Sequence, residues 1–317
     1  MIKKNHILCN LCGSDEPVIL FDAKDRLHGY EDTFTYVRCK KCSLVYMNPQ
    51  IAGDDMGIFY PPTYGPFQIS LKTPLLDENK LKRRAQRRPF VSLICKKLNR
   101  HSRLLDVGCG NGSFLNEIRI LTGCQTYGLD ISELAAKTAK ENYELDIHVG
   151  TILDAPFPER YFDVITAWEY LEHINDPSAV LLKIASLLKN DGSCIISTPN
   201  FDSFNCKLFK NKWYGLDCPR HLYIYSPRTV SGLLRKSGLS IQKIKYDKRS
   251  KGILGSLQYY FYGDNYNPEH CNRIRRSSLL KKIVSPLARI SALMKQSDAM
   301  IIHAKRASEE CVSFLHY

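Results

Sequence analysis

The chain has 317 residues, 44% of them hydrophobic, and a formal net charge of +13, which suits one α/β domain of ordinary size with a smaller attachment. No apolar run approaches the length needed to cross a bilayer, and the first residues lead into a polar segment rather than the apolar core of a signal peptide. We therefore expect a cytoplasmic protein whose twelve cysteines are reduced.

The positive charge is concentrated in two segments. Residues 80–105 carry ten Lys or Arg and no acid, and residues 271–306 carry nine with a single acid, Asp298. Two solvated helix faces are the simplest explanation. The alternative is an anionic partner, such as nucleic acid, a phosphorylated sugar or lipid, or the inner face of a membrane.

Two C-x-x-C knuckles lie near the N-terminus. Their thiols are those of Cys9, Cys12, Cys39 and Cys42. Paired knuckles are typical of tetrahedral zinc sites, whereas four unligated cysteines or a redox pair are the alternatives. We predict a structural zinc in a zinc-ribbon-like module over residues 1–48. Its three short strands have too little core of their own, so we expect the metal to supply folding energy.

Residues 49–100 are predicted to form a proline-rich linker or lid and a basic helix. Five prolines lie between residues 49 and 80, a density that disfavours regular structure. The basic stretch that ends at Arg103 is predicted to be a helix that packs on the sheet and presents a cationic outer face.

A glycine-rich turn follows the buried strand predicted over 104–107 and precedes a helix over 113–122. Its glycines allow a tight turn and a close approach of backbone to ligand. The G-x-G-x-G spacing puts Ser113 where a dinucleotide fingerprint requires a third glycine or alanine. Asp106, two residues before the first glycine, suits a cationic ligand better than a pyrophosphate. A second strand ends at Asp130, an acid that could hold a ribose diol.

Strands and helices then alternate, which predicts a parallel sheet covered on both faces. The further strands are expected over 146–149, 162–167, 193–197, 239–246 and 299–304. They complete a doubly wound, seven-stranded, mostly parallel sheet. An insertion at about 250–297 contains an amphipathic, basic helix over 279–294. We expect a surface helix there, with an interfacial helix on anionic lipid as the alternative.

The glycine loop and the acid of the second strand together resemble the class I S-adenosylmethionine-dependent methyltransferases. The resemblance covers residues 100–247 and the last strand. It implies that S-adenosylmethionine is held by Asp106, Gly108, Gly110, Gly112, Asp130, Ile131, Thr151, Ile152, Asp154 and Trp168. The first four residues would hold the methionine part and Asp130 the ribose. Ile131 and the turn at Thr151-Ile152 would contact the adenine. A proline-rich segment folds over the cofactor in similar enzymes, which makes Tyr60 and Tyr64 candidate contacts.

The resemblance also implies where the acceptor lies. The segment Glu169-Tyr170-Leu171-Glu172-His173 is similar to one in ubiquinone-pathway O-methyltransferases, where such residues can bind a divalent cation. The later T-P-N and P-R-H-L sequences resemble those of sugar methyltransferases, in which a histidine at the position of His221 lies near the substrate. Imidazole has a suitable pKa for a general base. His221 is thus the first catalytic candidate and His173 the second, while anchoring of the next helix is the alternative role for His221.

From these features we predict a methyltransferase domain over residues 101–317 that acts on a hydroxyl or carbon of a small-molecule acceptor. The expected acceptor is a nucleotide- or lipid-linked sugar, in polysaccharide biosynthesis, with possible peripheral membrane contact. An RNA methyltransferase is less favoured, because the chain lacks the N-P-P-Y-type sequence of amino-methylating enzymes and a cysteine nucleophile in T-P-N. A non-catalytic S-adenosylmethionine-binding protein is the third hypothesis.

Overall fold

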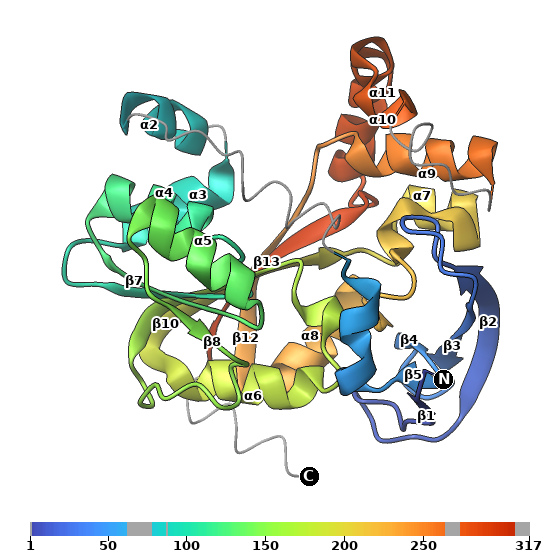
Figure 1. Ribbon diagram of the computed structural model, residues 1–317, viewed down its shortest axis with the longest axis horizontal. Helices are drawn as coiled ribbons and strands as arrows, with labels where there is room; N and C mark the ends of the chain where they lie inside the picture. Colours follow the sequence, from blue (N-terminus) through green and yellow to red (C-terminus); the bar gives the residue numbers. More distant parts are fainter. Residues whose placement is uncertain (1, 62–77, 87, 264–272, 308–317) are drawn as a thin grey trace.

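The computed structural model describes residues 2–61, 78–86, 88–263 and 273–307, and a seven-stranded sheet lies at its centre (Figure 1). In spatial order its strands are β12 (Leu239–Tyr246), β13 (Ala299–Arg306), β10 (Leu188–Pro199), β9 (Phe162–Trp168), β6 (Arg103–Val107), β7 (Gln125–Asp130) and β8 (Ile147–Val149). Strand β13 runs antiparallel to both of its neighbours, and the β10, β9, β6, β7 and β8 ladder is parallel. The predicted seven-stranded, mostly parallel sheet is therefore confirmed.

Helices cover both faces of the sheet (Figure 1). One face carries α3 (Pro89–Lys97), α4 (Ser113–Thr122) and α5 (Glu133–Tyr143), and the other carries α6 (Pro177–Leu187) and α8 (Pro227–Lys236). Successive side chains of a strand point to opposite faces, so Leu104 packs with the first group of helices and Leu105 with the second. Both faces are thus closed by apolar contact.

Two elements differ from the predictions in their bounds. The basic stretch forms two helices, α2 (Glu78–Gln86) and α3, because Pro89 starts a new helix at a position where its missing N–H costs nothing. Strand β10, predicted over 193–197, begins directly after α6 ends at Leu187, so that the N-D-G turn at residues 190–192 lies inside the strand. The pairing of β10 with β9 changes register between Leu188 and Ser193, so this turn forms an irregularity within the strand.

The N-terminal module is built into the rest of the molecule. Its antiparallel sheet contains β2 (Pro17–Lys24), β3 (Thr33–Cys39) and β4 (Val45–Met47). Its fourth strand is β11 (Tyr223–Ile224), which lies far from the other three in the sequence. A small pair, β1 (Lys4–Asn5) and β5 (Gln50–Ile51), precedes the 3₁₀ helix η1 (Gly53–Phe59). The buried side chains of Tyr36 and Tyr46 belong to the same apolar cluster as one face of the large sheet. The module shares that apolar core, and this packing stabilises its fold in addition to any stabilisation by a metal.

The C-terminal half adds short helices around the carboxyl ends of the strands. They are η2 (Leu171–His173), α7 (Phe204–Phe209), η3 (Lys210–Lys212), η4 (Tyr214–Leu216), α9 (Lys251–Tyr262), α10 (Arg273–Arg276) and α11 (Ser278–Leu293). Helix α9 packs against η4 so closely that a Cβ on Gly255 would lie 2.3 Å from the Tyr214 ring. Helices α10 and α11 project from the body (Figure 1), and α11 matches the helix predicted over 279–294. In the described part of the chain, no helix combines the length and apolarity of a membrane span.

Candidate active site

The glycine-rich loop lies at the carboxyl end of β6, beside the ends of β7 and β9. Gly108, Gly110 and Gly112 all have positive φ angles, of 70°, 52° and 71°. A side chain is strained in that conformation, and at Gly108 a Cβ would also lie 2.5 Å from the ring of Tyr170. The loop therefore requires glycine for its backbone and for the approach of Tyr170.

Two acidic side chains flank this loop, as predicted. Asp130 accepts hydrogen bonds from the N–H groups of Gly110 (2.8 Å) and Ser132 (2.9 Å), and burial raises its pKa. Asp106 is 2% exposed and accepts a hydrogen bond of 2.5 Å from the Thr166 hydroxyl. Burial raises the pKa of Asp106 to about 7. A cationic ligand in the loop would stabilise the ionised form of both side chains. The two carboxylates therefore fit a ligand that carries a sulfonium and an amino group.

The predicted adenine contacts fall into two kinds. Ile131 is 74% exposed at the end of β7 and can offer its side chain to a ligand. Ile152 is fully buried, so only its backbone can face the site. The Thr151 hydroxyl donates to the carboxylate of Asp154, which lowers the pKa of Asp154. These two residues therefore act as one polar unit beside the exposed end of the loop.

The segment after β9 connects the loop to the candidate base. Trp168 ends the strand, and its ring is edge-on to that of Phe114, with ring centroids 5.4 Å apart. Its buried indole N–H has no hydrogen-bond partner among the residues that the structure describes. Glu169 has a left-handed φ of 48° and accepts a hydrogen bond of 2.7 Å from the Ser197 hydroxyl. This turn directs Tyr170 onto the glycine loop and leads into η2, which holds Glu172.

His221 is held in one orientation and one tautomer. Its Nδ1–H donates to the carbonyl of Gly215 at 2.9 Å, because a carbonyl can only accept. Its Nε2 is then unprotonated, at 3.9 Å from a carboxylate oxygen of Glu172 and 3.9 Å from one of Asp217. Burial lowers the pKa of His221, so the ring is neutral at pH 7. A neutral imidazole with an available Nε2 can accept a proton.

His173 lies next to His221, with ring centroids 4.6 Å apart. Its Nδ1 is 3.1 Å from the carbonyl of Arg220 and 2.9 Å from the hydroxyl of Tyr60. Burial lowers the pKa of His173 to about 3. Tyr60, a candidate cofactor contact, is thus a partner of His173, whereas Tyr64 lies outside the described residues.

Glu172 completes this cluster. Its side chain is fully buried, and neither carboxylate oxygen has a hydrogen-bond partner in the described ranges. Burial raises the pKa of Glu172 well above its usual value, and the negative charge of Glu169 is the second cause of this increase. Possible metal-ligand atoms of Glu172, His173 and His221 all lie within 4.8 Å of one another. These three side chains could therefore hold a divalent cation.

A buried arginine that the sequence analysis did not identify lies beside the cluster. Arg220 is fully buried and donates two hydrogen bonds of 3.0 Å to Asp25, in the N-terminal module. It also donates to Asp217 from Nε (3.1 Å) and Nη2 (2.8 Å). Burial opposes ionisation of Asp217, but the guanidinium outweighs it and holds the pKa of Asp217 well below its usual value. Asp217 therefore stays negative beside His221.

The N-terminal module also contacts the backbone around His221. The Tyr36 hydroxyl donates to the carbonyl of His221 at 2.7 Å, and the N–H of Met47 donates to the carbonyl of Leu222 at 2.8 Å. The N–H of Leu222 in turn donates to the carbonyl of Glu172 at 2.7 Å. The candidate base is thus clamped between η2 and the antiparallel sheet.

The four knuckle cysteines meet at one point. Cys9 and Cys42 have Sγ atoms 3.3 Å apart, those of Cys12 and Cys39 are 3.5 Å apart, and all four lie within 4.8 Å. Sulfurs around a tetrahedral zinc with bonds of about 2.3 Å are about 3.8 Å apart, so the cluster fits that ion. Burial opposes ionisation of Cys39, but hydrogen bonds from the N–H of Cys42 and from the Cys12 thiol outweigh it and lower its pKa to about 7.

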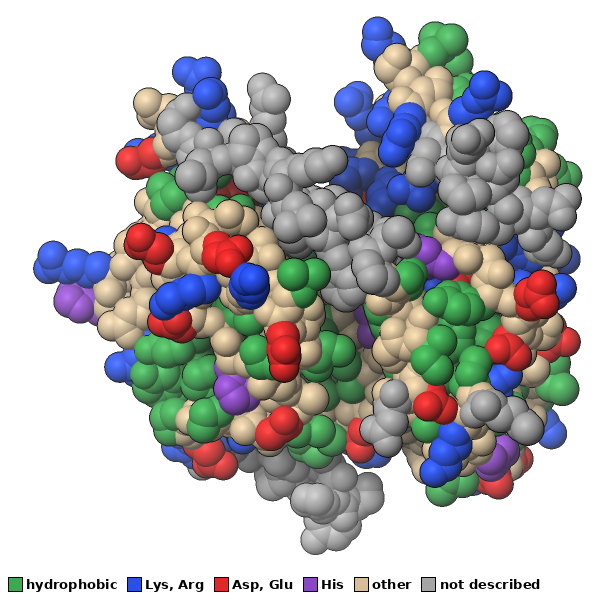
Figure 2. Space-filling view, in the orientation of Figure 1, with side chains coloured by type: hydrophobic (Ala, Val, Ile, Leu, Met, Phe, Trp, Pro, Cys, Tyr) green, Lys and Arg blue, Asp and Glu red, His purple; other side chains and the backbone are tan. Residues whose placement is uncertain are grey.

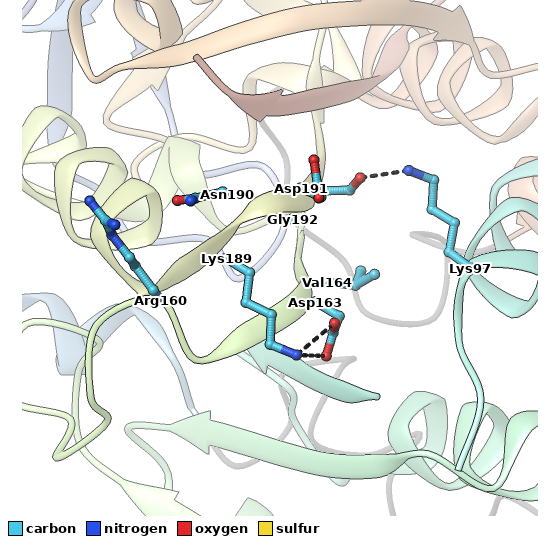
Figure 3. Close-up of a pocket in the computed structure, with 9 residues that line it drawn as sticks. Lys97, Arg160, Asp163, Val164, Lys189, Asn190, Asp191 and Gly192 are labelled. Carbon is cyan, nitrogen blue, oxygen red and sulfur yellow. Dashed lines mark hydrogen bonds and ion pairs between the residues drawn. The ribbon is translucent and has the colours of Figure 1, made fainter. Parts of the chain in front are cut away.

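A cavity of about 570 Å³ lies at the opposite edge of the sheet (Figure 3). It is lined by the amino ends of β9 and β10 and by Lys97. Lys189 forms two contacts of 2.8 Å with Asp163, and Lys97 donates to the Ser193 hydroxyl at 2.7 Å. These polar groups satisfy one another, and the cavity contains none of the predicted site residues.

A family model described as a methyltransferase domain matches residues 79–244, more than half of the chain. The chain belongs to this methyltransferase family. The family resemblance inferred from the glycine loop is therefore confirmed. Among solved structures, a geranyl diphosphate methyltransferase in complex with SAM superposes with a TM-score of 0.50 at 15% identity, covering 76% of this chain and 95% of that one. At this identity, the likeness shows the fold alone.

Two similar relatives carry the name ubiquinone biosynthesis O-methyltransferase. The protein from Proteus mirabilis is 38% identical over 164 residues, covering 48% of this chain and 63% of that one. The protein from Xanthomonas euvesicatoria is 30% identical over 155 residues, covering 45% of this chain and 64% of that one. The match thus spans just under two thirds of the length of these relatives. Their names refer to ubiquinone biosynthesis and mention neither a sugar nor a polysaccharide.

Proposed function

We propose that this methyltransferase transfers a methyl group from S-adenosylmethionine to a hydroxyl group of a small-molecule acceptor. The observation that carries the proposal is the direct connection between the glycine loop and the cluster around His221. Tyr170 packs on Gly108 of the cofactor loop, and Glu172, two residues later, lies 3.9 Å from Nε2 of His221. The residues that would bind a cationic cofactor and the histidine that would accept a proton are thus joined by one short segment, which supports a single site.

The cofactor would be held by the residues of the loop and the two strand ends. When bound, it supplies an electrophilic methyl group on a sulfonium. Asp106 would face its positive charge, Asp130 its ribose hydroxyls and Ile131 its adenine. Thr151, Asp154 and Trp168 would provide the remaining polar contacts. Asp106, Asp130 and Trp168 lie at the ends of strands, and the glycines form the turn after β6, so this part of the site would be organised before the ligand binds.

His221 would accept the proton of the acceptor hydroxyl at Nε2 as the oxygen–methyl bond forms. Asp217, kept ionised by Arg220, lies 3.9 Å from that atom and would stabilise the imidazolium. His173 would have a positioning role, since its Nδ1 lies within hydrogen-bond distance of the Arg220 carbonyl and the Tyr60 hydroxyl. A base of this kind contributes about 10²- to 10⁴-fold to a rate.

The names of the relatives favour a hydroxyl acceptor over a carbon. A nucleotide- or lipid-linked sugar stays our finer proposal, supported by the P-R-H-L sequence around His221 and by the basic charge. We further propose that the cysteine cluster holds a structural zinc, which would fix the sheet that clamps His221. The module thereby supports the active site mechanically.

Transfer of labelled methyl from S-adenosylmethionine into fractionated cell extract tests this proposal. Label in a small-molecule or lipid-linked fraction, lost with His221→Asn, is the expected result. Label removed by ribonuclease would establish the RNA alternative instead. Cofactor binding without transfer into any fraction would favour the non-catalytic binder.

A further inference from the structure

Helix α11 presents an apolar stripe to solvent. Six side chains of this stripe, each more than half exposed, are Leu279, Ile283, Leu287, Ile290, Leu293 and Met294. Their spacing of three and four residues puts them on one continuous side of the helix. The side that faces the body is different and consists of Val284, Ala288 and Ala292, which are buried. The exposed stripe is therefore additional to the face that anchors the helix.

Positive charge surrounds this stripe. Residues 273–297 contain seven Lys or Arg and no Asp or Glu. Lys282 and Arg289 border the stripe along the helix, and Arg276 is exposed in the neighbouring α10. Figure 2 shows green and blue side chains gathered over the projection formed by these two helices. An apolar face with a basic border matches both the hydrocarbon and the phosphate groups of an anionic bilayer.

We propose that α11 docks on the surface of an anionic phospholipid membrane, with its apolar stripe in the interface and its basic side chains on the lipid phosphates. The charge argues for this partner over a second copy of the chain, since two such helices face to face would bring like charges together. The length and polarity of α11 suit a helix that lies on a membrane and does not cross it.

Docking would bring the candidate active site close to the lipid. Helix α11 packs on α9, and Ser256 of α9 accepts a hydrogen bond of 3.0 Å from the N–H of Tyr214. The next residue, Gly215, accepts the hydrogen bond from His221. An acceptor with a lipid tail would therefore reach the site from the membrane, a consequence that rests on the proposed function, whereas the docking itself does not.

Sedimentation with vesicles tests the docking independently of any turnover. The full chain should bind vesicles of phosphatidylglycerol and phosphatidylcholine, and bind pure phosphatidylcholine vesicles about tenfold or more weakly. The double variant Ile283→Asp/Leu287→Asp should lose about tenfold or more of this binding. The matched control is Leu182→Asp, a similarly exposed leucine on α6, which should bind like the wild type. Thermal unfolding of each variant confirms that it is folded.

Charge removal provides the second arm. Lys281→Gln/Lys282→Gln/Arg289→Gln should weaken binding to anionic vesicles and reduce its salt dependence, while leaving the apolar stripe intact. Wild-type protein that ignores anionic vesicles would overturn the proposal. Equal loss in the Leu182→Asp control would do the same. A dimer in light scattering that Leu287→Asp converts to a monomer, without vesicle binding, would assign the stripe to a second copy of the chain.

Discussion

Asp25 joins the N-terminal module to the segment that carries His221, so Asp25→Asn tests whether the module positions the base. The carboxylate accepts one hydrogen bond from each Nη atom of Arg220, and both side chains are fully buried. An amide would keep one acceptor and turn its NH₂ toward the guanidinium, where two donors would face each other. The contact to Asp217 remains, so the arginine keeps one ionic partner.

The size of the effect follows from these contacts. A hydrogen bond to a charged group contributes about 1.5–3 kcal/mol, and removing one partner of a buried pair costs about 3–5 kcal/mol. Because Asp217 still compensates the arginine, we expect the free energy of unfolding to fall by about 2–4 kcal/mol, less than the full cost of removing one partner of a buried pair. The loosened clamp should also lower kcat for methyl transfer while leaving cofactor affinity unchanged, since the glycine loop is untouched.

Urea unfolding and single-turnover kinetics measure the two effects. The control is Glu16→Gln, which removes an exposed ion pair with Lys41 at 3.5 Å in the same module. Such pairs contribute about 0–1 kcal/mol. An Asp25→Asn variant no less stable than Glu16→Gln would show that the module does not hold Arg220 in place. An unchanged kcat in a destabilised protein would show that the module does not position the base.

Three further predictions concern the cofactor, the metal and pH. Asp130→Asn should weaken S-adenosylmethionine binding about 10- to 100-fold in calorimetry, through loss of a charge-assisted contact, and unchanged affinity would place the ribose elsewhere. Purified protein should contain about one zinc per chain, which Cys39→Ser should abolish and Cys95→Ser, outside the cluster, should retain; a folded wild type free of metal would contradict the zinc site. Since the pKa of His173 is about 3 in the folded chain and about 6.5 when unfolded, its protonation favours unfolding. The stability it contributes is complete above pH 6.5 and falls by about 1.4 kcal/mol per pH unit below that, and His173→Asn should flatten this dependence; parallel curves for variant and wild type would reject it.

The seven-stranded, mostly parallel sheet and the glycine loop were accessible from the sequence because their signals are local. The G-x-G-x-G turn and the acid that ends β7 each occupy a few neighbouring residues. The arrangement around the base depends on long-range contacts instead. Arg220 meets Asp25 across most of the chain, and β11 pairs with β4 although it is only two residues long. No periodicity marks a short strand or a buried ion pair.

Exposure is the second property that the sequence left open. The pattern over 279–294 predicted an amphipathic helix, but an apolar residue looks the same whether it faces the body or the solvent. The structure separates Val284, which is buried, from Ile283 and Leu287, which are exposed. The same holds for Ile152, predicted beside the adenine, whose side chain lies in the core.

We propose that one site binds the cofactor and that His221 removes the proton of the acceptor hydroxyl there. The most direct test measures cofactor binding and methyl transfer for the wild type and His221→Asn with the fraction that accepts label. We predict that both proteins bind about one S-adenosylmethionine per chain and that the variant transfers methyl about 10²- to 10⁴-fold more slowly. Equal rates would remove His221 from the chemistry, and absence of cofactor binding to the wild type would contradict the account as a whole.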